Sequence, residues 1–199
     1  CYVNLVVLGE KGVGKTSIIE RFVNSQFSHR HAPTVRKKEF FPSLVLDTHV
    51  FELKIIDLPS IPHFPMNTNE EWALYRYYGL RSATAYILVY DLSSQDSFTY
   101  IKKIRDQILE SRNMTNVTIM VVANKADLIA GYCAEATWPL RSRQEVVSLV
   151  SKQWRLIHLE CSARYNWNVA NIFKQLSLTL QSSLNRSGSA TPEPKKKCC

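Results

Sequence analysis

The sequence lacks long apolar segments and clustered cysteines. No apolar run approaches the roughly 18 residues that a helix needs to span a bilayer, so no membrane-spanning helix is expected. The five cysteines are Cys1, Cys133, Cys161 and the terminal pair Cys198 and Cys199, and this spacing indicates neither a disulfide framework nor a zinc-ligand set. No signal peptide is evident either, and we expect a reducing, cytosolic environment.

The composition is that of one folded domain with a basic charge. The chain has 199 residues, 45% of them hydrophobic, and a formal net charge of +8. This apolar content is too high for a disordered chain, and the length suits a single core. The charge by itself leaves nucleic acid, anionic lipid or an acidic ligand open as partners.

Hydrophobic periodicity predicts strands that alternate with helices. Continuous apolar runs at 3–8, 85–90 and 118–123 indicate strands buried on both faces, and a shorter strand is expected at 156–161. Helical spacing recurs at 98–109 and 169–180, and segments 39–46 and 49–56 form a hairpin across Asp47-Thr48. We therefore expect an α/β fold with a mostly parallel sheet, one antiparallel edge strand and helices on both faces. Ligands of such sheets bind beyond the carboxyl ends of the strands.

The composition changes after Leu184. Residues 185–199 read NRSGSATPEPKKKCC, are rich in Ser, Pro and Lys, and contain no large apolar residue. We predict a folded domain over residues 1–184 and a flexible basic tail over 185–199.

A phosphate-binding loop follows the first predicted strand. GEKGVGKT, residues 9–16, matches G-x-x-x-x-G-K-[ST] and is followed by a predicted helix. A simple glycine-rich turn is the alternative, but a chance match is expected in only roughly one chain in a hundred. Successive backbone N–H groups and the helix N-terminus would bind phosphate, Lys15 would reach the β- and γ-phosphates, and Thr16 would bind Mg²⁺. The expected phosphate-binding residues are Gly9, Glu10, Lys11, Gly12, Val13, Gly14, Lys15, Thr16 and Ser17.

A second motif indicates a guanine site. Asn124, Lys125 and Asp127 follow the apolar strand that ends at Ala123. The Asp127 carboxylate can accept hydrogen bonds from guanine N1–H and the 2-amino group, which adenine does not offer. Such bonding can reject the wrong base by roughly 10⁴ to 10⁵.

Together these motifs resemble those of the Ras superfamily of small GTPases, a P-loop NTPase family with a Ras-like G domain, over roughly residues 2–184. The runs FPMNTNEEWA and ECSARYNW are more similar to the atypical Ras-like family member 10 group than to Ras itself. The resemblance implies GTP and GDP as ligands and Mg²⁺ as cofactor. It also implies a guanine site formed by Phe27, Asn124, Lys125, Asp127, Ser162, Ala163 and Arg164. In it Asn124 and Asp127 hold the base, Lys125 stacks on it, and the Ala163 N–H meets guanine O6.

The resemblance also implies two switch segments, around 31–40 and 58–75. Thr34, in HAPTV, matches the threonine that closes on Mg²⁺ and the γ-phosphate, and Asp57 matches the aspartate that holds Mg²⁺ through water. With Thr16 these residues make the expected magnesium site. The catalytic set carried over is Lys15, Thr34 and the backbone N–H of Ser60.

The second switch departs from the family pattern of Thr-Ala-Gly-Gln. Leu58, Pro59, Ser60 and Ile61 follow Asp57, and an isoleucine cannot orient water by hydrogen bonding. Lys11 stands where a small residue is usual and would crowd an arginine finger. We predict weak GTPase activity and a second switch stiffened by its prolines. His63 as a replacement water-orienting group is a minor alternative.

The first switch departs in charge. Arg36, Lys37 and Lys38 stand where Ras has acidic residues, so the usual basic effectors are poor partners and a partner with an acidic face is expected. A solvated basic edge strand is the alternative. The exchange factor and the activating protein cannot be named from the sequence.

The tail indicates a membrane anchor. Lys195, Lys196 and Lys197 precede Cys198 and Cys199. The resemblance implies prenylation there, either of a Cys-Cys end or of a C-a-a-X box. Three lysines near anionic lipid contribute on the order of 3 kcal/mol, and a lipid supplies the second signal for stable attachment. The expected place is the cytoplasmic face of the plasma membrane or an endomembrane, with a cytosolic fraction.

The predicted function is a membrane-attached guanine-nucleotide switch. The alternative is an interaction module that holds guanine nucleotide and does not cycle. A small-molecule kinase is disfavoured by NKAD, and nucleic-acid binding is not needed to explain the charge.

Overall fold

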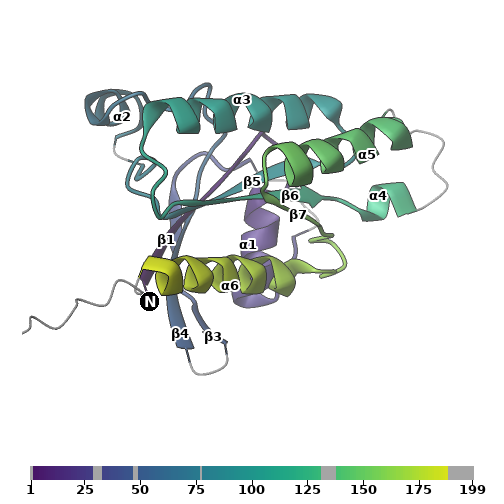
Figure 1. The fold of residues 1–199 in the computed structure, drawn as a ribbon. Helices are drawn as coiled ribbons and strands as arrows, with labels where there is room; N and C mark the ends of the chain where they lie inside the picture. The colour runs from purple at the N-terminus through teal and green to yellow at the C-terminus, as the bar shows by residue number, and fades with distance from the viewer. Residues whose placement is uncertain (1, 29–32, 47–48, 77, 131–137, 188–199) are drawn as a thin grey trace, which may run out of the picture.

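The computed structural model describes residues 2–28, 33–46, 49–76, 78–130 and 138–187 (Figure 1). These residues form a mixed sheet in the order β2-β4-β1-β5-β6-β7, and β3 also pairs with β4. The strands are β1 (Tyr2–Gly9), β2 (Lys38–Phe40), β3 (Ser43–Leu46), β4 (His49–Asp57), β5 (Ala85–Asp91), β6 (Thr118–Asn124) and β7 (Ile157–Glu160). The helices are α1 (Lys15–Asn24), α2 (Thr68–Tyr75), α3 (Gln95–Ser111), α4 (Asp127–Ala130), α5 (Leu140–Ser148), the π-helix η1 (Leu149–Gln153) and α6 (Val169–Ser187).

The predicted fold class is confirmed. Strands β4, β1, β5, β6 and β7 are parallel, and β2 and β3 run antiparallel to β4. Helices α1 and α6 cover one face of the sheet, whereas α2, α3 and α5 cover the other (Figure 1). Central strands are therefore apolar at successive positions, since both of their faces are buried.

Two apolar cores flank the sheet. Leu5 and Val7 of β1 pack with Ile18 and Phe173 in the core beneath α1 and α6. Val6 and Leu8, which point the other way, belong to the core beneath α2, α3 and α5. The two cores fix the carboxyl ends of the strands, where the predicted motifs lie.

The edge strand expected over 39–46 is divided in two. Phe40 pairs with Ile55 and Ser43 with Glu52, so β2 and β3 keep one register along β4. Between them the Leu53 N–H still donates to the Pro42 carbonyl at 3.0 Å. Pro42 has no N–H to return, and the ladder is interrupted there. The predicted turn at 47–48 lies outside the described residues.

The chain end differs partly from expectation. Helix α6 continues to Ser187, past the domain boundary predicted at Leu184. Residues 188–199, which carry the lysine run with Cys198 and Cys199, lie outside the described residues, and the anchor stays a prediction. None of the helices that the structure describes is both long and apolar enough to cross a bilayer.

Candidate nucleotide-binding site

A cleft of about 860 Å³ lies at the carboxyl edge of the sheet and gathers most of the predicted site residues. Those lining it are Lys11, Gly12, Gly14, Lys15, Thr16, Ser17, Phe27, Thr34, Ser60, Asn124, Lys125, Asp127, Ala163 and Arg164. Gly9, Val13, Asp57 and Ser162 are buried beside it, and Glu10 is half-buried. Segments distant in the sequence thus converge on one cavity of the size typical of small-molecule sites.

The phosphate loop, residues 9–16, joins β1 to α1 through left-handed backbone conformations at Gly12 and Gly14, which glycine adopts without strain. Gly14 caps α1 with a φ of 95°. A Cβ at Gly14 would also collide with the Asn124 side-chain amide, so both the backbone and the packing require glycine. The first N–H groups of α1 consequently face the cleft, where an anion can accept their hydrogen bonds.

Lys15 places an ammonium group against the same loop. Its Nζ donates to the carbonyl oxygens of Gly9 at 2.9 Å and Glu10 at 3.0 Å, and the residue is 6% exposed. Burial lowers its pKa, and the negative charges of Asp57 and Glu10 oppose this effect. A cation held here attracts phosphate oxygens strongly, because the surrounding dielectric is low.

The predicted magnesium residues meet at the start of α1. The Thr16 hydroxyl donates to Asp57 Oδ2 at 2.6 Å, and Thr16 Oγ1 lies 2.7 Å from Thr34 Oγ1. Asp57 Oδ1 is buried without a hydrogen-bond partner among the described residues, and burial raises the pKa of this carboxyl. A hard cation would satisfy that oxygen, and hydroxyl and carboxylate oxygens are the ligands that Mg²⁺ prefers. In the described ranges no three His, Cys, Asp or Glu side chains gather as a metal site.

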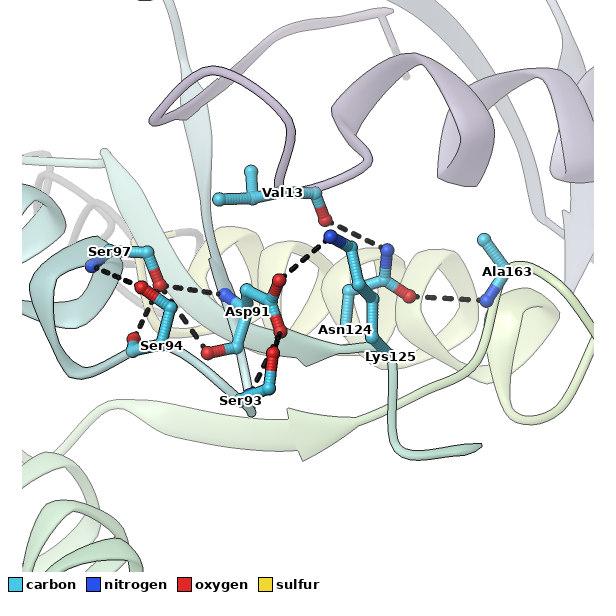
Figure 2. A network of polar contacts seen from close by, with 8 residues as sticks. All are labelled: Val13, Asp91, Ser93, Ser94, Ser97, Asn124, Lys125 and Ala163. Atoms are coloured by element: carbon cyan, nitrogen blue, oxygen red, sulfur yellow. Dashed lines mark hydrogen bonds and ion pairs between the residues drawn. The ribbon is translucent and has the colours of Figure 1, made fainter. Parts of the chain in front are cut away.

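Asn124 joins the phosphate loop to the loop after β7. Its Nδ2 donates to the Val13 carbonyl at 2.9 Å, while its Oδ1 accepts from the Ala163 N–H at 3.1 Å and from the Cys161 thiol at 3.4 Å. Figure 2 shows this amide between Val13 and Ala163. Asn124, which is expected to hold the base, thus connects the phosphate loop to the loop around Ala163. The Ala163 N–H, which is predicted to meet guanine O6, donates to Asn124 Oδ1 in this structure.

Asp127 carries the carboxylate that the sequence analysis predicts to select guanine. The Ser162 hydroxyl donates to Asp127 Oδ1 at 2.6 Å. This bond orients the carboxylate at the cleft wall and leaves lone pairs on both oxygens for further donors. Ser162 is itself buried and does not line the cleft, so it contacts Asp127 from behind the cleft wall.

Lys125 is held by a residue that the sequence analysis did not single out. Its Nζ lies 2.7 Å from Asp91 Oδ2, and the Ser93 N–H and hydroxyl donate to Asp91 Oδ1 at 2.8 and 2.7 Å (Figure 2). Lys125 has a φ of 66°, a left-handed conformation that turns the chain sharply after β6. Asp91 ends the apolar strand β5, so the rule that ligands gather at carboxyl ends could have identified it.

Arg21, which the sequence analysis also did not single out, connects the last turns of α1 to the loop of Ala163 and Arg164, called the base loop below. Its Nε donates to the Ala163 carbonyl at 3.0 Å, and another guanidinium nitrogen donates to the Arg164 carbonyl at 2.9 Å. The guanidinium carbon lies 5.4 Å from the centre of the Phe27 ring, which lines the cleft. Arg21 thereby positions both Phe27 and the loop around Ala163.

The segment 58–66 of the second switch is packed into the protein rather than into the cleft. Ile61 is 2% exposed, and Leu58 and Phe64 are fully buried. The Tyr100 hydroxyl of α3 accepts from the Ile61 N–H at 3.0 Å and donates to the Ile61 carbonyl at 2.6 Å. Only Pro59 and Ser60 of this segment line the cleft.

Further hydrogen bonds hold the same segment. The Phe64 N–H donates to Gln107 Oε1 at 2.9 Å, and the Tyr75 hydroxyl donates to the His63 carbonyl at 2.6 Å. The His63 ring lies 3.1 Å from Glu70 Oε1, away from the residues that line the cleft. This placement disfavours His63 as a water-orienting group.

The comparisons with known proteins agree with this geometry. The model of the Ras family matches residues 4–182. Over 174 residues the chain is 42% identical to Ras-like protein family member 10B of Homo sapiens, covering 86% of this chain and 82% of that protein. Over 191 residues it is 36% identical to human Ras-like protein family member 10A, covering 94% and 89%. It is also 28% identical over 183 residues to the GTP-binding protein rhb1 of Schizosaccharomyces pombe, covering 92% and 90%.

Proposed function

The chain belongs to the Ras family of small GTPases, and on this premise we propose that it is a membrane-attached guanine-nucleotide switch with slow GTP hydrolysis. Members of this family bind GTP and GDP, generally with Mg²⁺, and signal through partners that recognise the nucleotide state. The main observation in support of this proposal is that the phosphate loop, Asn124 and Asp127 all line one cleft.

The cleft divides into parts with different chemistry. The α1 N-terminus and Lys15 attract phosphates, and the carboxylate of Asp127 selects guanine. Thr16, Thr34 and Asp57 would hold Mg²⁺. A Mg²⁺ ion bound there would neutralise the negative charge of the phosphate oxygens.

Slow hydrolysis follows from the second switch. The reaction needs a water molecule oriented toward the γ-phosphate, and Ile61 is buried with its backbone bonded to Tyr100. Its apolar side chain offers no hydrogen bond to a water molecule, whereas a glutamine at this position would. The same observation favours the second candidate function, a guanine-nucleotide-bound interaction module that does not cycle.

Two measurements test the proposal and separate the candidates. Chromatography of nucleotide released from freshly purified protein should identify GDP or GTP, and Asp127→Ala should abolish the preference for guanine over adenine nucleotides. Single-turnover hydrolysis should then be slower than in typical Ras proteins. A rate at or above theirs would contradict slow hydrolysis, and no turnover at all would favour the non-cycling module.

For the cellular context we propose membrane attachment through Cys198 and Cys199 with the adjacent lysines, at the cytoplasmic face of the plasma membrane or an endomembrane. The basic run Arg36–Lys38 supports an effector with an acidic face. Replacing both cysteines with serine should move the protein from the membrane to the soluble fraction. Membrane recovery equal to that of the unmodified sequence would contradict lipid anchoring at these positions.

A further inference from the structure

Two charged side chains that belong to none of the predicted nucleotide-site residues line the magnesium end of the cleft. Lys38, the first residue of β2, lines the cleft together with Thr16 and Thr34. Glu20 of α1 lines it as well, and because it follows Thr16 by four residues, both lie on one face of the helix. The residues predicted to bind magnesium therefore have an ammonium group and a second carboxylate close by.

The register of the sheet directs the Lys38 side chain toward α1. Lys38 lies opposite Asp57 in the antiparallel pair of β2 and β4, and side chains at opposed positions leave the sheet on the same face. That face is the one that α1 covers, because the Asp57 carboxylate accepts from the Thr16 hydroxyl at 2.6 Å. Lys38 Nζ lies 4.0 Å from Glu20 Oε1, which places the ammonium group between β2 and α1.

Lys38 is held more loosely than Lys15 and Lys125, which line the same cleft. Lys15 donates to two carbonyl oxygens at 2.9 and 3.0 Å, and Lys125 lies 2.7 Å from Asp91. The contact of Lys38 with Glu20 is long at 4.0 Å, and the Lys38 side chain is 53% exposed. An exposed ion pair of this length stabilises a protein little, so the ammonium group can leave Glu20 for a stronger anion.

The charges of both side chains act on Asp57. Burial raises the pKa of the Asp57 carboxyl, the positive charges of Lys15 and Lys38 oppose this effect, and the negative charge of Glu20 adds to it. A bound nucleotide would bring its phosphates to the same end of the cleft, because Lys15 and the N-terminus of α1 attract them. Without a divalent cation, the negative charges of Asp57, Glu20 and the phosphates would repel one another.

We propose that Lys38 faces the phosphates of the bound nucleotide and that its ammonium group partly replaces the charge of Mg²⁺, so that nucleotide is retained when the cation is scarce. The proposal rests on the proposed function, since the phosphates are those of a guanine nucleotide. Glu20 competes with the phosphates for Lys38. Removal of Mg²⁺ should consequently release less nucleotide than it would from a chain with a neutral residue at position 38.

The rate of nucleotide release from the full chain tests the proposal. The chain is loaded with GDP that carries a fluorescent N-methylanthraniloyl group, and release is followed after addition of excess unlabelled GDP. Each measurement is made at millimolar Mg²⁺ and again in excess EDTA. Lys38→Gln should speed release about fivefold in EDTA and less than about twofold in Mg²⁺, because the bound cation then supplies the main positive charge.

Glu20→Gln separates a phosphate contact from a structural ion pair. If Lys38 acts on the phosphates, loss of the competing carboxylate should slow release in EDTA by about twofold or more. An ion pair that only ties β2 to α1 would be broken by either variant, and both variants would then speed release. Lys38→Arg keeps the positive charge and should release nucleotide within about twofold of the unmodified rate.

Lys54→Gln is the matched control. Lys54 is also a lysine on this side of the sheet, but it does not line the cleft and lies 3.2 Å from Glu39. Glu39 follows Lys38 in β2 and therefore points to the opposite face of the sheet. Lys54→Gln should leave the release rate unchanged with and without Mg²⁺. The effect of Lys38→Gln should shrink in about 1 M salt, which screens charges beyond roughly 3 Å.

Four results would overturn the proposal. They are equal release from Lys38→Gln and the unmodified chain in EDTA, an effect of Lys38→Gln that is the same in Mg²⁺ and EDTA, faster release from Glu20→Gln, and equal effects of Lys38→Gln and Lys54→Gln. In each case the guanine-nucleotide site itself stands, since release is measured from a loaded chain. A chain that takes up no labelled GDP at millimolar Mg²⁺ would refute the proposed function and this proposal with it.

Discussion

Replacing Tyr100 with phenylalanine should release the second switch without disturbing the nucleotide cleft. The variant removes one hydroxyl, which accepts from the Ile61 N–H and donates to the Ile61 carbonyl. Burial raises the pKa of Tyr100 to about 12, so the hydroxyl remains a neutral donor over the physiological range. The ring stays in place, and the change is confined to these two hydrogen bonds.

The size of the effect on local opening follows from the Ile61 N–H and carbonyl, which lose the Tyr100 hydroxyl as their partner. A buried polar group without a partner costs about 1–3 kcal/mol. The bonds of Phe64 to Gln107 and of His63 to Tyr75 would persist, so the segment should open locally before the protein unfolds. An intermediate cost of about 2 kcal/mol corresponds to roughly thirtyfold faster exchange of the amides at 58–66.

Hydrogen exchange measured by mass spectrometry is the assay, with Tyr90→Phe as the matched control. Tyr90 is also buried, but its hydroxyl bonds to His158 of β7 at 2.8 Å and not to the second switch. In the unmodified protein the 58–66 amides should be equally protected in the GDP and GTP-analogue forms. Unchanged protection in Tyr100→Phe, or equal loss of protection in Tyr90→Phe, would refute the assignment of the restraint to Tyr100.

Three further predictions concern the site and the core. Asp91→Ala should weaken GTP binding by about tenfold, because Lys125 loses its partner at 2.7 Å; a filter-binding assay measures this, and unchanged affinity would contradict the positioning role. Ile61→Gln alone should not accelerate GTP hydrolysis, because residue 61 is buried and its carbonyl is bonded to Tyr100. In single-turnover measurements the double variant Ile61→Gln with Tyr100→Phe should hydrolyse GTP faster than Ile61→Gln. Burial lowers the pKa of His158 to about 4, so its contribution to stability is present above the unfolded pKa of roughly 6.5 and is lost as pH falls toward 4. Urea unfolding should therefore show a loss of about 2 kcal/mol between pH 7 and pH 5 that His158→Gln lacks.

The sheet and its flanking helices were predictable because their signals are local. Unbroken apolar runs such as 85–90 identify doubly covered strands, and the spacing in 98–109 matches α3. The division of the edge strand was missed because the apolar pattern continues through Pro42, which removes one hydrogen bond without changing the register. Helix α5 was also missed, since its sequence LRSRQEVVS has few apolar residues.

The cleft was predicted from motifs, but its supports were not. The residues of GEKGVGKT and NKAD converge as expected. Arg21 and Tyr100 act across 142 and 39 positions of sequence, and only the folded chain reveals such pairings. The sequence identified Ile61 as unable to orient water, and the structure adds that its backbone is restrained away from the cleft.

The Asn124 amide bears on how long a nucleotide stays bound. One side chain connects the Val13 carbonyl of the phosphate loop with the Ala163 N–H of the base loop. The two halves of the cleft should then loosen in a concerted step, because an opening at either end breaks bonds at the other. We expect the residence time of the nucleotide to be set by this step, so an exchange factor would need to displace only one of the two loops to speed release.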